Sequence, residues 1–328
     1  MQRIAAVIPN WNGSAMLAQL LCALQRQSRI IDRVIVVDNG SSDDSAAIAQ
    51  RAGAEVIQLP TNTGFSHAVN LGIQNTRANA GADWIAILNN DVYPQPDWLA
   101  NLLEKAQSQN AWFAAGKLLD ASSAGRVDGA FDAICRGACA WRCGHGRPDS
   151  PLWNHPRQIH FAPFTAALFR AELFERVGLL DEAFESYLED IDFGLRCALA
   201  GFHGAYVPEA VAYHAGSATL GRWHPATVAK ISRNQLLIVA KHYPRHWVLR
   251  YGWPVLVAQT LWGLVALRHG AGFAYLRGKL DGLHHFREAR GKAAVNFPSI
   301  VEASENQILE IQRLTGFDTY WRLYFALT

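Results

Sequence analysis

The chain has 328 residues, of which half are hydrophobic and 18% are charged. This apolar content is enough for a large packed core and excludes an intrinsically disordered chain. The formal net charge is only +2, and no basic cluster occurs in the first two thirds, which argues against nucleic acid binding. The first apolar run, Ile4–Ile8, is too short for a secretory signal, so we expect a cytoplasmic protein with five reduced cysteines.

Strand-like and helix-like segments alternate through the first 119 residues. Short β-rich runs predict the strands Ile4–Ile8, Val34–Val37, Val56–Leu59 and Trp84–Leu88. Helical spacing of apolar residues predicts helices over residues 14–27, 43–51, 66–78 and 97–107. This alternation predicts a mostly parallel sheet flanked by helices, in which ligands bind beyond the carboxyl ends of the strands.

The second half of the chain is less regular. Residues 120–160 show no periodicity, and a strand over Thr165–Arg170 follows, with helices near Glu172–Val177 and from Leu188 to Gly201. After about residue 220, Trp, His and Arg become frequent within long apolar helical stretches. We therefore expect an α/β domain over residues 1–220 and a helical carboxyl-terminal region over residues 221–328.

A polar turn, Asp38-Asn39-Gly40-Ser41-Ser42-Asp43, begins where the second predicted strand ends. A carboxylate here can accept a hydrogen bond from the imide N–H of uracil or thymine. The helix that follows offers its N-terminus to a phosphate. A tight turn with Ser42 capping a helix explains the same residues without any ligand.

A second polar turn, Asn89-Asn90-Asp91, follows the fourth predicted strand. Asp91 is a candidate ligand for Mg²⁺ or Mn²⁺, because hard divalent cations take one or two carboxylates together with phosphate oxygens. Such an ion stabilises the charge on a departing diphosphate. One such turn is an ordinary structural feature, whereas two at equivalent sheet positions favour a shared site.

Three carboxylates, Glu189, Asp190 and Asp192, stand at the predicted start of a helix. Their charges complement the helix dipole, which is by itself a sufficient reason for them. The alternative is that one is a general base that removes a proton from a hydroxyl. Asp190 and Asp192 lie about 200° apart around a helix, so only one is expected to face the site.

Three further candidates are less distinctive. His214 follows a short β-rich stretch and is either a metal ligand or an ordinary structural histidine. Gly64, within Asn62-Thr63-Gly64-Phe65, permits close backbone approach to a nucleotide but also suits a plain helix entry. Asn70 lies in the helix that follows.

Taken in this order, the motifs resemble inverting family 2 glycosyltransferases of the GT-A fold, and among them bacterial rhamnosyltransferase-like members. The resemblance spans about residues 3–245. The matching strings are Val36–Asp43, Asn62–Phe65 with Asn70, Leu88–Asp91, Val177–Phe184, Tyr187–Asp192, and Tyr206–Pro208 with His214. Relatives usually show a Ser-Gly-Ala-like stretch where this chain has Phe164-Thr165-Ala166-Ala167, which leaves the acceptor open.

The resemblance implies a Rossmann-like GT-A sheet and direct, inverting transfer of a sugar from a pyrimidine nucleotide diphosphate donor. It favours dTDP-rhamnose as the donor and leaves galactose, glucose and other sugars open, and its acceptor is expected to be a glycan or polyprenyl-linked glycan of a cell-surface polysaccharide. It implies Mg²⁺ or Mn²⁺ at Asp91 and His214, with Asp190 as the base and Asp192 as the alternate. It places the donor against Pro9, Asn10, Asp38, Asn39, Gly64, Asn70 and Asn90.

Two other function classes stay open. A sugar nucleotidyltransferase also binds pyrimidine nucleotides on a related sheet. Such enzymes carry a basic residue directly after the first strand, where this chain has Pro9-Asn10-Trp11-Asn12-Gly13. The other alternative is a catalytically inactive membrane scaffold, which the presence of Asp38, Asp91 and Asp190 disfavours.

Three cysteines, Cys135, Cys139 and Cys143, are spaced four apart, with His145 and His155 nearby. Thiolates and imidazoles bind zinc, although this spacing matches no strong zinc motif. The same spacing places small apolar side chains on one helix face, so core packing is the alternative.

The stretch Tyr251–Leu267 is uncharged and lies between Arg250 and Arg268. A membrane-spanning helix needs about 20 apolar residues, and polar residues interrupt this one, so a full span is not expected. Aromatic and basic residues around it suit an interfacial helix at the inner face of the cytoplasmic membrane, while burial against the main domain is the alternative. These residues are Trp247, Trp253, Trp262, Lys241 and Arg245.

Overall fold

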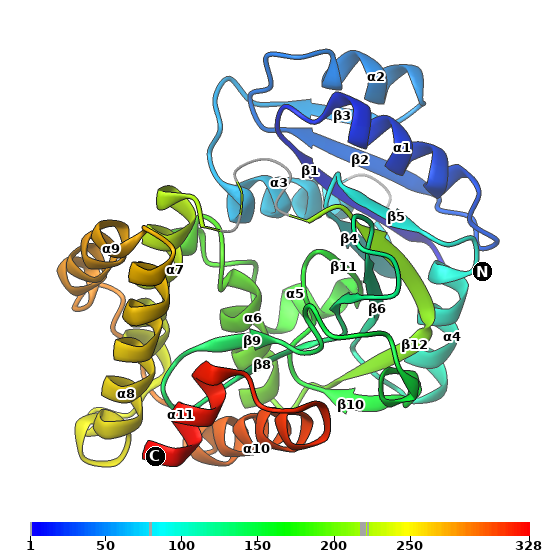
Figure 1. The fold of residues 1–328 in the computed structure, drawn as a ribbon. Coiled ribbons are helices and arrows are strands. Elements are labelled where there is room, and N and C mark those ends of the chain that lie inside the picture. Colours follow the sequence, from blue (N-terminus) through cyan, green and yellow to red (C-terminus); the bar gives the residue numbers. More distant parts are fainter. Residues whose placement is uncertain (1, 79–80, 217–220, 222) are drawn as a thin grey trace.

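The computed structural model describes residues 2–78, 81–216, 221 and 223–328 (Figure 1). One large sheet is flanked by helices, which confirms the predicted α/β class with carboxyl-terminal helices. Within the described residues the sheet has ten strands, in the order β10-β12-β6-β11-β4-β1-β2-β3, with β5 beside β12 and β7 beside β6. The predicted domain boundary at residue 220 lies outside the described residues.

The first half of the fold follows the predicted alternation. Its elements are β1 (Ile4–Asn10), α1 (Ser14–Gln25), β2 (Arg33–Asp38), α2 (Ser45–Arg51), β3 (Glu55–Gln58), α3 (Phe65–Ala78) and β4 (Trp84–Leu88). β1 pairs in parallel with β2 and β4, and β2 pairs in parallel with β3. The carboxyl ends of β1, β2 and β4 therefore meet at one edge, where Asn10 is in register with Asp38.

The second half makes the sheet mixed rather than mostly parallel. After β5 (Val92–Pro94) and α4 (Trp98–Ser108), β6 (Phe113–Asp120) runs parallel to β12 (Gly204–His214). Between β4 and β6, β11 (Ala166–Arg170) is antiparallel to both. β6 ends at the carboxyl edge of the sheet, and β11 begins at that same edge, so β11 runs in the opposite direction to both of its neighbours.

The region predicted to be irregular contains several very short elements. They are β7 (Val127–Gly129), β8 (Asp132–Ile134), β9 (Ala140–Arg142), η1 (Pro151–Asn154) and β10 (Arg157–Ile159). β8 and β9 form an antiparallel hairpin in which Asp132 is opposite Arg142. Strands of three residues are too short to show a period in the sequence, so the hairpin escaped prediction.

The three evenly spaced cysteines belong to this hairpin region and not to a helix face. Cys135, Cys139 and Cys143 are free, buried and part of the main apolar cluster. Across the described residues, no group of three or more His, Cys, Asp or Glu side chains is placed to hold a metal ion. Core packing is thus the interpretation that these contacts support.

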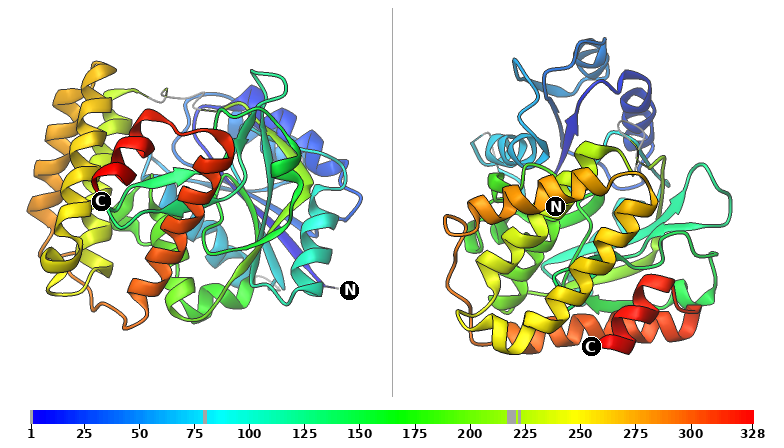
Figure 2. Two further views of the ribbon diagram at one scale, coloured as in Figure 1. Left: turned by 60° about the horizontal axis from the view of Figure 1, so that its bottom comes forward. Right: turned by 60° about the vertical axis from the view of Figure 1, so that its left-hand side comes forward.

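The carboxyl-terminal part of the chain is helical. After α5 (Ala171–Arg176), η2 (Glu182–Phe184), α6 (Glu189–Leu199) and β12 come α7 (Pro225–His242), α8 (Trp247–Arg268), α9 (Gly272–His285), α10 (Phe297–Thr315) and α11 (Thr319–Leu327). Helices α7, α8 and α9 lie together on one side of the molecule, and α10 and α11 lie beside β8 and β9 (Figures 1 and 2). Among the described residues, none of the helices has the length and apolarity that a membrane span requires.

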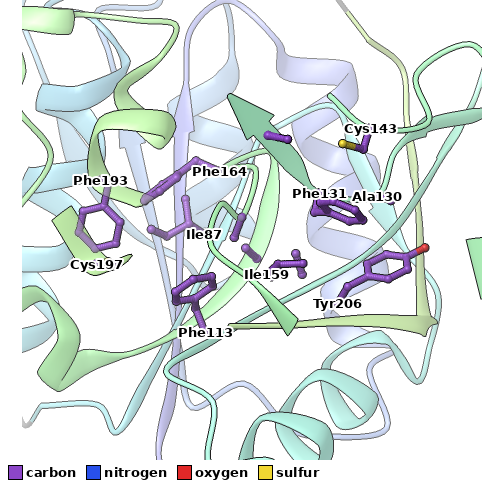
Figure 3. Packing of buried hydrophobic residues seen from close by; sticks show 14 of the residues in the cluster. Ile87, Phe113, Ala130, Phe131, Cys143, Ile159, Phe164, Phe193, Cys197 and Tyr206 are labelled. Carbon is purple, nitrogen blue, oxygen red and sulfur yellow. The ribbon is translucent and has the colours of Figure 1, made fainter. Parts of the chain in front are cut away.

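Two apolar clusters cover the two faces of the sheet, because successive side chains of a strand point to opposite faces. On β4, Ile85 and Ile87 belong to one cluster, whereas Ala86 and Leu88 belong to the other. The first cluster is rich in aromatic rings (Figure 3). In it, Phe193 of α6 packs edge-on against Phe164, with ring centroids 5.4 Å apart. This contact fastens the start of α6 to the sheet.

Candidate active site

Asn10 joins the two polar turns at the carboxyl edge of the sheet. Its Nδ2 donates to Asp38 Oδ1 at 3.2 Å and to Ser41 Oγ at 3.3 Å. Its Oδ1 accepts from Asn90 Nδ2 at 2.7 Å. Pro9 precedes it on β1, in register with Val37 of β2. The parallel pairing therefore brings the ends of β2, β1 and β4 into one hydrogen-bonded row.

Asp91, next in sequence to Asn90, faces His214 at the end of β12. His214 Nε2 lies 3.3 Å from Asp91 Oδ1, and Nδ1 lies 2.8 Å from Asp128 Oδ2. All three side chains are buried. Burial disfavours the charged imidazole, but the hydrogen bond to Asp128 and the nearby Asp91 carboxylate outweigh it and raise the pKa of His214 to about 9. The predicted pair Asp91 and His214 is thus brought together.

Arg142 extends this row of charges toward α6. Its Nη1 lies 3.4 Å from Asp128 Oδ2, and its Nε lies 3.7 Å from Asp132 Oδ1. Its Nη2 donates to Thr165 Oγ1 at 3.0 Å. Although burial opposes ionisation, hydrogen bonds from His145 and His214 hold the pKa of Asp128 well below its usual range. The ions therefore alternate in sign from Asp128 through Arg142 to Asp132.

The start of α6 adds carboxyl groups to the far end of this row. Asp190 accepts a hydrogen bond from the Ile191 backbone N–H at 2.8 Å, and the charge of Arg142 acts on it. Burial, partly offset by Arg142, raises the pKa of Asp132 to about 7 and also raises the pKa of Asp190. Burial and the charge of Asp190 raise the pKa of Glu189 well above its usual range. Asp190 alone among these three is partly exposed.

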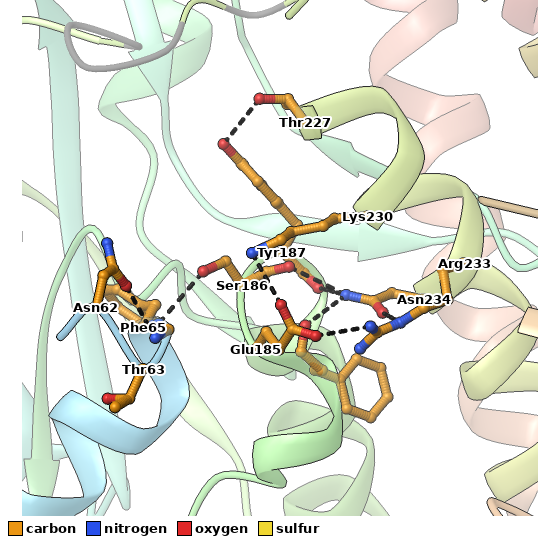
Figure 4. A network of polar contacts seen from close by, with 12 residues as sticks. Asn62, Thr63, Phe65, Glu185, Ser186, Tyr187, Thr227, Lys230, Arg233 and Asn234 are labelled. Carbon is orange, nitrogen blue, oxygen red and sulfur yellow. Dashed lines mark hydrogen bonds and ion pairs between the residues drawn. The ribbon is translucent and has the colours of Figure 1, made fainter. Parts of the chain in front are cut away.

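The backbone that enters α6 is strained. Glu185, Tyr187 and Leu188 have φ values of 57°, 72° and 66°, and such left-handed residues cost about 1–3 kcal/mol each. Asn234 of α7 holds the segment, because its Nδ2 lies 2.7–3.0 Å from the carbonyl oxygens of residues 184, 186 and 187 (Figure 4). Arg233, also on α7, pairs with Glu185 at 2.8 Å. These contacts fix where Asp190 points.

Asp192, predicted as the alternate base, is placed differently from Asp190. It is fully buried and lies 2.9 Å from Arg196 Nε, 2.9 Å from Lys241 Nζ and 2.7 Å from His242 Nε2. Despite burial, these partners lower the pKa of Asp192 well below its usual range. The two carboxylates face opposite sides of α6, as the helix geometry predicts, and Asp192 fastens α6 to α7.

Three residues predicted to contact the nucleotide make specific contacts within the protein. Asn39 Oδ1 accepts from Thr63, and its Nδ2 donates to the Gly64 carbonyl at 3.0 Å. Gly64 lies against residue 185, since a Cβ on it would be 3.1 Å from that carbonyl oxygen. Asn70 exchanges hydrogen bonds of 2.9 and 3.0 Å with the backbone of Leu180. Their close packing is therefore explained without a ligand.

Several residues of the charged row that leads from Asp91 to Asp190 were not predicted from the sequence. Asp128, Asp132 and Arg142 lie in the region without periodicity, and nothing in their spacing indicates that they meet. Glu189 was visible only as part of the acidic helix start. Each of the three-residue strands β7, β8 and β9 carries a single charged residue, which is too little to show a pattern in the sequence.

Two surface hollows of the described residues lie elsewhere. One has a volume of about 470 Å³ and is lined by residues of α10 and α11 together with Arg136. Neither hollow includes Asp38, Asp91 or Asp190. These three residues are related by polar contacts, which link Asp38 to Asn90 and Asp91 to Arg142, whose charge acts on Asp190.

In open α/β sheets of this kind, ligands bind beyond the carboxyl ends of the strands, which is where this row of polar residues lies. The family description Glycosyl transferase family 2 matches residues 5–178, which is more than half of the chain. The chain therefore belongs to the family 2 glycosyltransferases.

Similar proteins come from Mycobacterium tuberculosis. Its N-acetylglucosaminyl-diphospho-decaprenol L-rhamnosyltransferase is 28% identical over 255 residues, which cover 72% of this chain and 81% of that protein. Its pre-mycofactocin glycosyltransferase is 28% identical over 225 residues, which cover 67% of this chain and 44% of that protein.

Two solved structures share the fold. A mannosyltransferase from Pyrobaculum calidifontis, in complex with GDP-Man and Mn2+, has a TM-score of 0.54 at 15% identity and matches 99% of this chain and 86% of that chain. GalNAc-T7, solved with UDP, GalNAc and Mn2+, has a TM-score of 0.62 at 14% identity and matches 97% of this chain and 58% of that chain. At these identities the likeness shows a shared GT-A fold.

The contacts of Asp192 predict a loss of stability when its charge is removed. We expect Asp192→Asn to lower the free energy of unfolding by about 3–5 kcal/mol, because Arg196, Lys241 and His242 lose a fully buried carboxylate partner. Urea unfolding measures this change. Asp190→Asn is the matched control and should change the value by less than about 1 kcal/mol. Equal losses in the two variants would contradict the structural role of Asp192.

The raised pKa of Asp132 predicts how stability depends on pH. Asp132 binds its proton more tightly in the folded chain than in the unfolded chain, where the pKa is about 3.9. Its contribution is therefore fully present below pH 4 and is lost as the pH rises toward 7, by up to about 1.4 kcal/mol per pH unit. Asp132→Asn should flatten the decline of unfolding free energy between pH 4 and 7, and an unchanged slope would refute this assignment.

Proposed function

We propose that the protein transfers L-rhamnose from dTDP-rhamnose, with inversion, to a hydroxyl group of a polyprenyl-linked glycan during cell-surface polysaccharide synthesis. The observation that carries the proposal is the meeting of two groups of polar contacts at the carboxyl edge of a family 2 chain. Asp38 is linked through Asn10 to Asn90. The next residue, Asp91, lies beside His214 in the ionic row that leads through Asp128 and Arg142 toward Asp190. Each part of this row has a role in the transfer.

Asp38 is assigned to bind the pyrimidine base of the nucleotide-sugar donor. Asn10 engages Oδ1 of this carboxylate, while Oδ2 accepts no hydrogen bond from the described part of the chain. That oxygen can accept the imide N–H of a pyrimidine, which supports a dTDP or UDP donor. Asn10 and Asn90, which are bonded to each other, place the two strand ends at which the diphosphate would lie.

Asp91 and His214 suit a divalent cation. Asp91 Oδ1 is buried and lacks a hydrogen-bond partner among the described residues, although His214 Nε2 is only 3.3 Å away. Asp128 holds Nδ1 of the same imidazole, as a carboxylate does for many metal-binding histidines. When bound, Mg²⁺ or Mn²⁺ would neutralise charge on the leaving diphosphate. Carboxylate, imidazole and phosphate oxygens form an appropriate ligand set.

Asp190 is assigned as the general base. It is the partly exposed carboxyl at the end of the row, and burial raises its pKa, which increases its affinity for a proton. It would take the proton of the acceptor hydroxyl while that oxygen forms a bond to the anomeric carbon. The bond from that carbon to the diphosphate breaks, and the nucleoside diphosphate leaves with the electron pair.

The acceptor class is taken from the similar proteins. The mycobacterial relative is named for transfer of L-rhamnose to N-acetylglucosaminyl-diphospho-decaprenol. A lipid-linked acceptor of this kind requires the enzyme at the inner face of the cytoplasmic membrane. Thr165, in the stretch where the sequence departs from its relatives, accepts a hydrogen bond from Arg142 at 3.0 Å.

Nucleoside diphosphate release from dTDP-rhamnose tests the proposed activity. We expect release with Mn²⁺ and a polyprenyl diphosphate N-acetylglucosamine acceptor, and a loss of about 10²–10⁴ in kcat for Asp190→Asn. Glu172→Gln, on the exposed surface of α5, is the control and should keep full activity. Release of pyrophosphate instead would indicate a nucleotidyltransferase, and silence with every pyrimidine nucleotide sugar would indicate an inactive scaffold.

Metal removal tests whether sugar transfer needs a divalent cation, and Mn²⁺ binding to variants tests which residues hold that cation. We expect EDTA to abolish transfer and Mn²⁺ to restore it. Mn²⁺ binding in the presence of dTDP, followed by electron paramagnetic resonance, should be lost in Asp91→Asn and weakened about 10–100-fold in Asp128→Asn. Asp190→Asn should bind Mn²⁺ normally despite its low activity. Normal binding by Asp91→Asn would remove this residue from the metal site.

A further inference from the structure

Helices α8 and α9 each present one stripe of large apolar side chains to solvent. The stripe residues recur every three or four positions, except that the exposed Thr260 stands between Leu256 and Leu264, so each set occupies one face of its helix. All are more than half exposed, and Leu249 and Phe273 reach 90% and 92%. The stripes consist of Leu249, Trp253, Leu256, Leu264 and Leu267 in α8, and Phe273, Leu276, Leu280 and Leu283 in α9.

The opposite faces of both helices are packed, so the stripes point outward. Gly278 of α9 touches α7, since a Cβ there would lie 2.1 Å from the Ala229 carbonyl oxygen. On α8, Ala258 and Gln259 are buried against the hairpin turn at Gly137. In the right-hand view of Figure 2 both helices lie on the face turned toward the reader. Soluble proteins seldom leave so much contiguous apolar surface uncovered.

Basic residues border these stripes. Residues 244–292 contain eight Lys or Arg and only two acidic residues, Asp281 and Glu288, although the whole chain has a formal net charge of only +2. The remainder of the chain is therefore net negative. Five of the basic residues are exposed and make no ion pair within the described residues: Arg245, Arg268, Arg277, Arg287 and Lys292.

We propose that α8 and α9 together form a docking face for an anionic lipid bilayer. Leucine and aromatic side chains would enter the boundary between headgroups and acyl chains, and the bordering arginines would contact lipid phosphates. This inference deepens the proposed function and rests on it for the lipid-linked acceptor. A second copy of the chain is a poorer occupant, because a two-fold interface would bring the same unpaired cations together.

This face differs from the one that the sequence indicated. Of the three tryptophans, only Trp253 is exposed, whereas Trp262 stacks on Trp223 with ring centroids 5.9 Å apart. Lys241 pairs with Asp181 and Asp192 and is occupied inside the protein. The contribution of α9 was not recognised from the sequence, because its mean hydropathy is diluted by Gly, Lys and Arg.

The docking face is directly connected to the candidate active site. Gln259 of α8 donates to the Gly137 carbonyl at 2.8 Å. Gly137 lies in the turn between β8 and β9, which carry Asp132 and Arg142. A bilayer on the outer side of α8 would therefore fix the orientation of the acidic row relative to the membrane surface.

Vesicle flotation tests this face. The full chain should float with vesicles of phosphatidylcholine and phosphatidylglycerol, and much less with phosphatidylcholine alone. Phe273→Ser combined with Leu276→Ser should weaken binding at least tenfold, by about 1.4 kcal/mol or more of lost apolar burial. Leu314→Ser, an equally exposed leucine on α10, is the matched control and should bind like the unchanged protein. Thermal stabilisation by dTDP with Mn²⁺ confirms that each variant is folded.

The outcomes are separable. Equal flotation of the double variant and the control overturns the proposal. The proposal is also overturned if sedimentation shows that the double variant has lost self-association while its flotation is unchanged, because the stripes would then be a contact between copies of the chain. Flotation without nucleoside diphosphate release would support the docking face and contradict the proposed activity. Sugar transfer without flotation would support the proposed activity and contradict the docking face.

Discussion

A single, partly exposed guanidinium holds the acidic site together. Arg142 lies between Asp128 and Asp132, and the charge of Asp190 acts on the same cation. Buried carboxylates are tolerated only when they are paired, since each loses its hydration. Without this cation, these three carboxyl groups from three separate segments would repel one another at the carboxyl edge. The position of the short β8–β9 hairpin places Arg142 within reach of all three, so the arrangement of the site depends on this hairpin.

The carboxyl-terminal helices are part of this arrangement and not a detached appendage. The family description covers residues 5–178, yet Asn234, Arg233 and His242 of α7 fix the strained entry to α6 and the carboxylate of Asp192. Backbone strain persists only where surrounding contacts enforce it. The residue assigned as base is consequently positioned by a helix outside the matched region, and α8 links the same site to the outer apolar face.

Much of the fold could be predicted because local patterns carry it. The β-branched run Val34–Val37 predicts a strand, and the helical spacing of the leucines in α1 predicts a helix. The polar residues that follow the strands indicate the edge of the sheet where ligands bind. Asp91 and His214, the two predicted metal ligands, lie side by side in the structure, with Oδ1 and Nε2 3.3 Å apart. The sequence did not distinguish Asn70, which binds the backbone of Leu180, from a ligand contact, because an isolated asparagine looks the same in either role.

The sequence by itself determined the order of strands and helices up to residue 119 and the chemistry available at the strand ends, since both depend on near neighbours. Only the tertiary structure decided the reversal of β11, the alignment of Asp128 with His214 and the separation of Asp190 from Asp192. The reason is distance along the chain: Asp128 and His214 are 86 residues apart, and Asp192 and His242 are 50 apart. No local period records which buried charge will meet which.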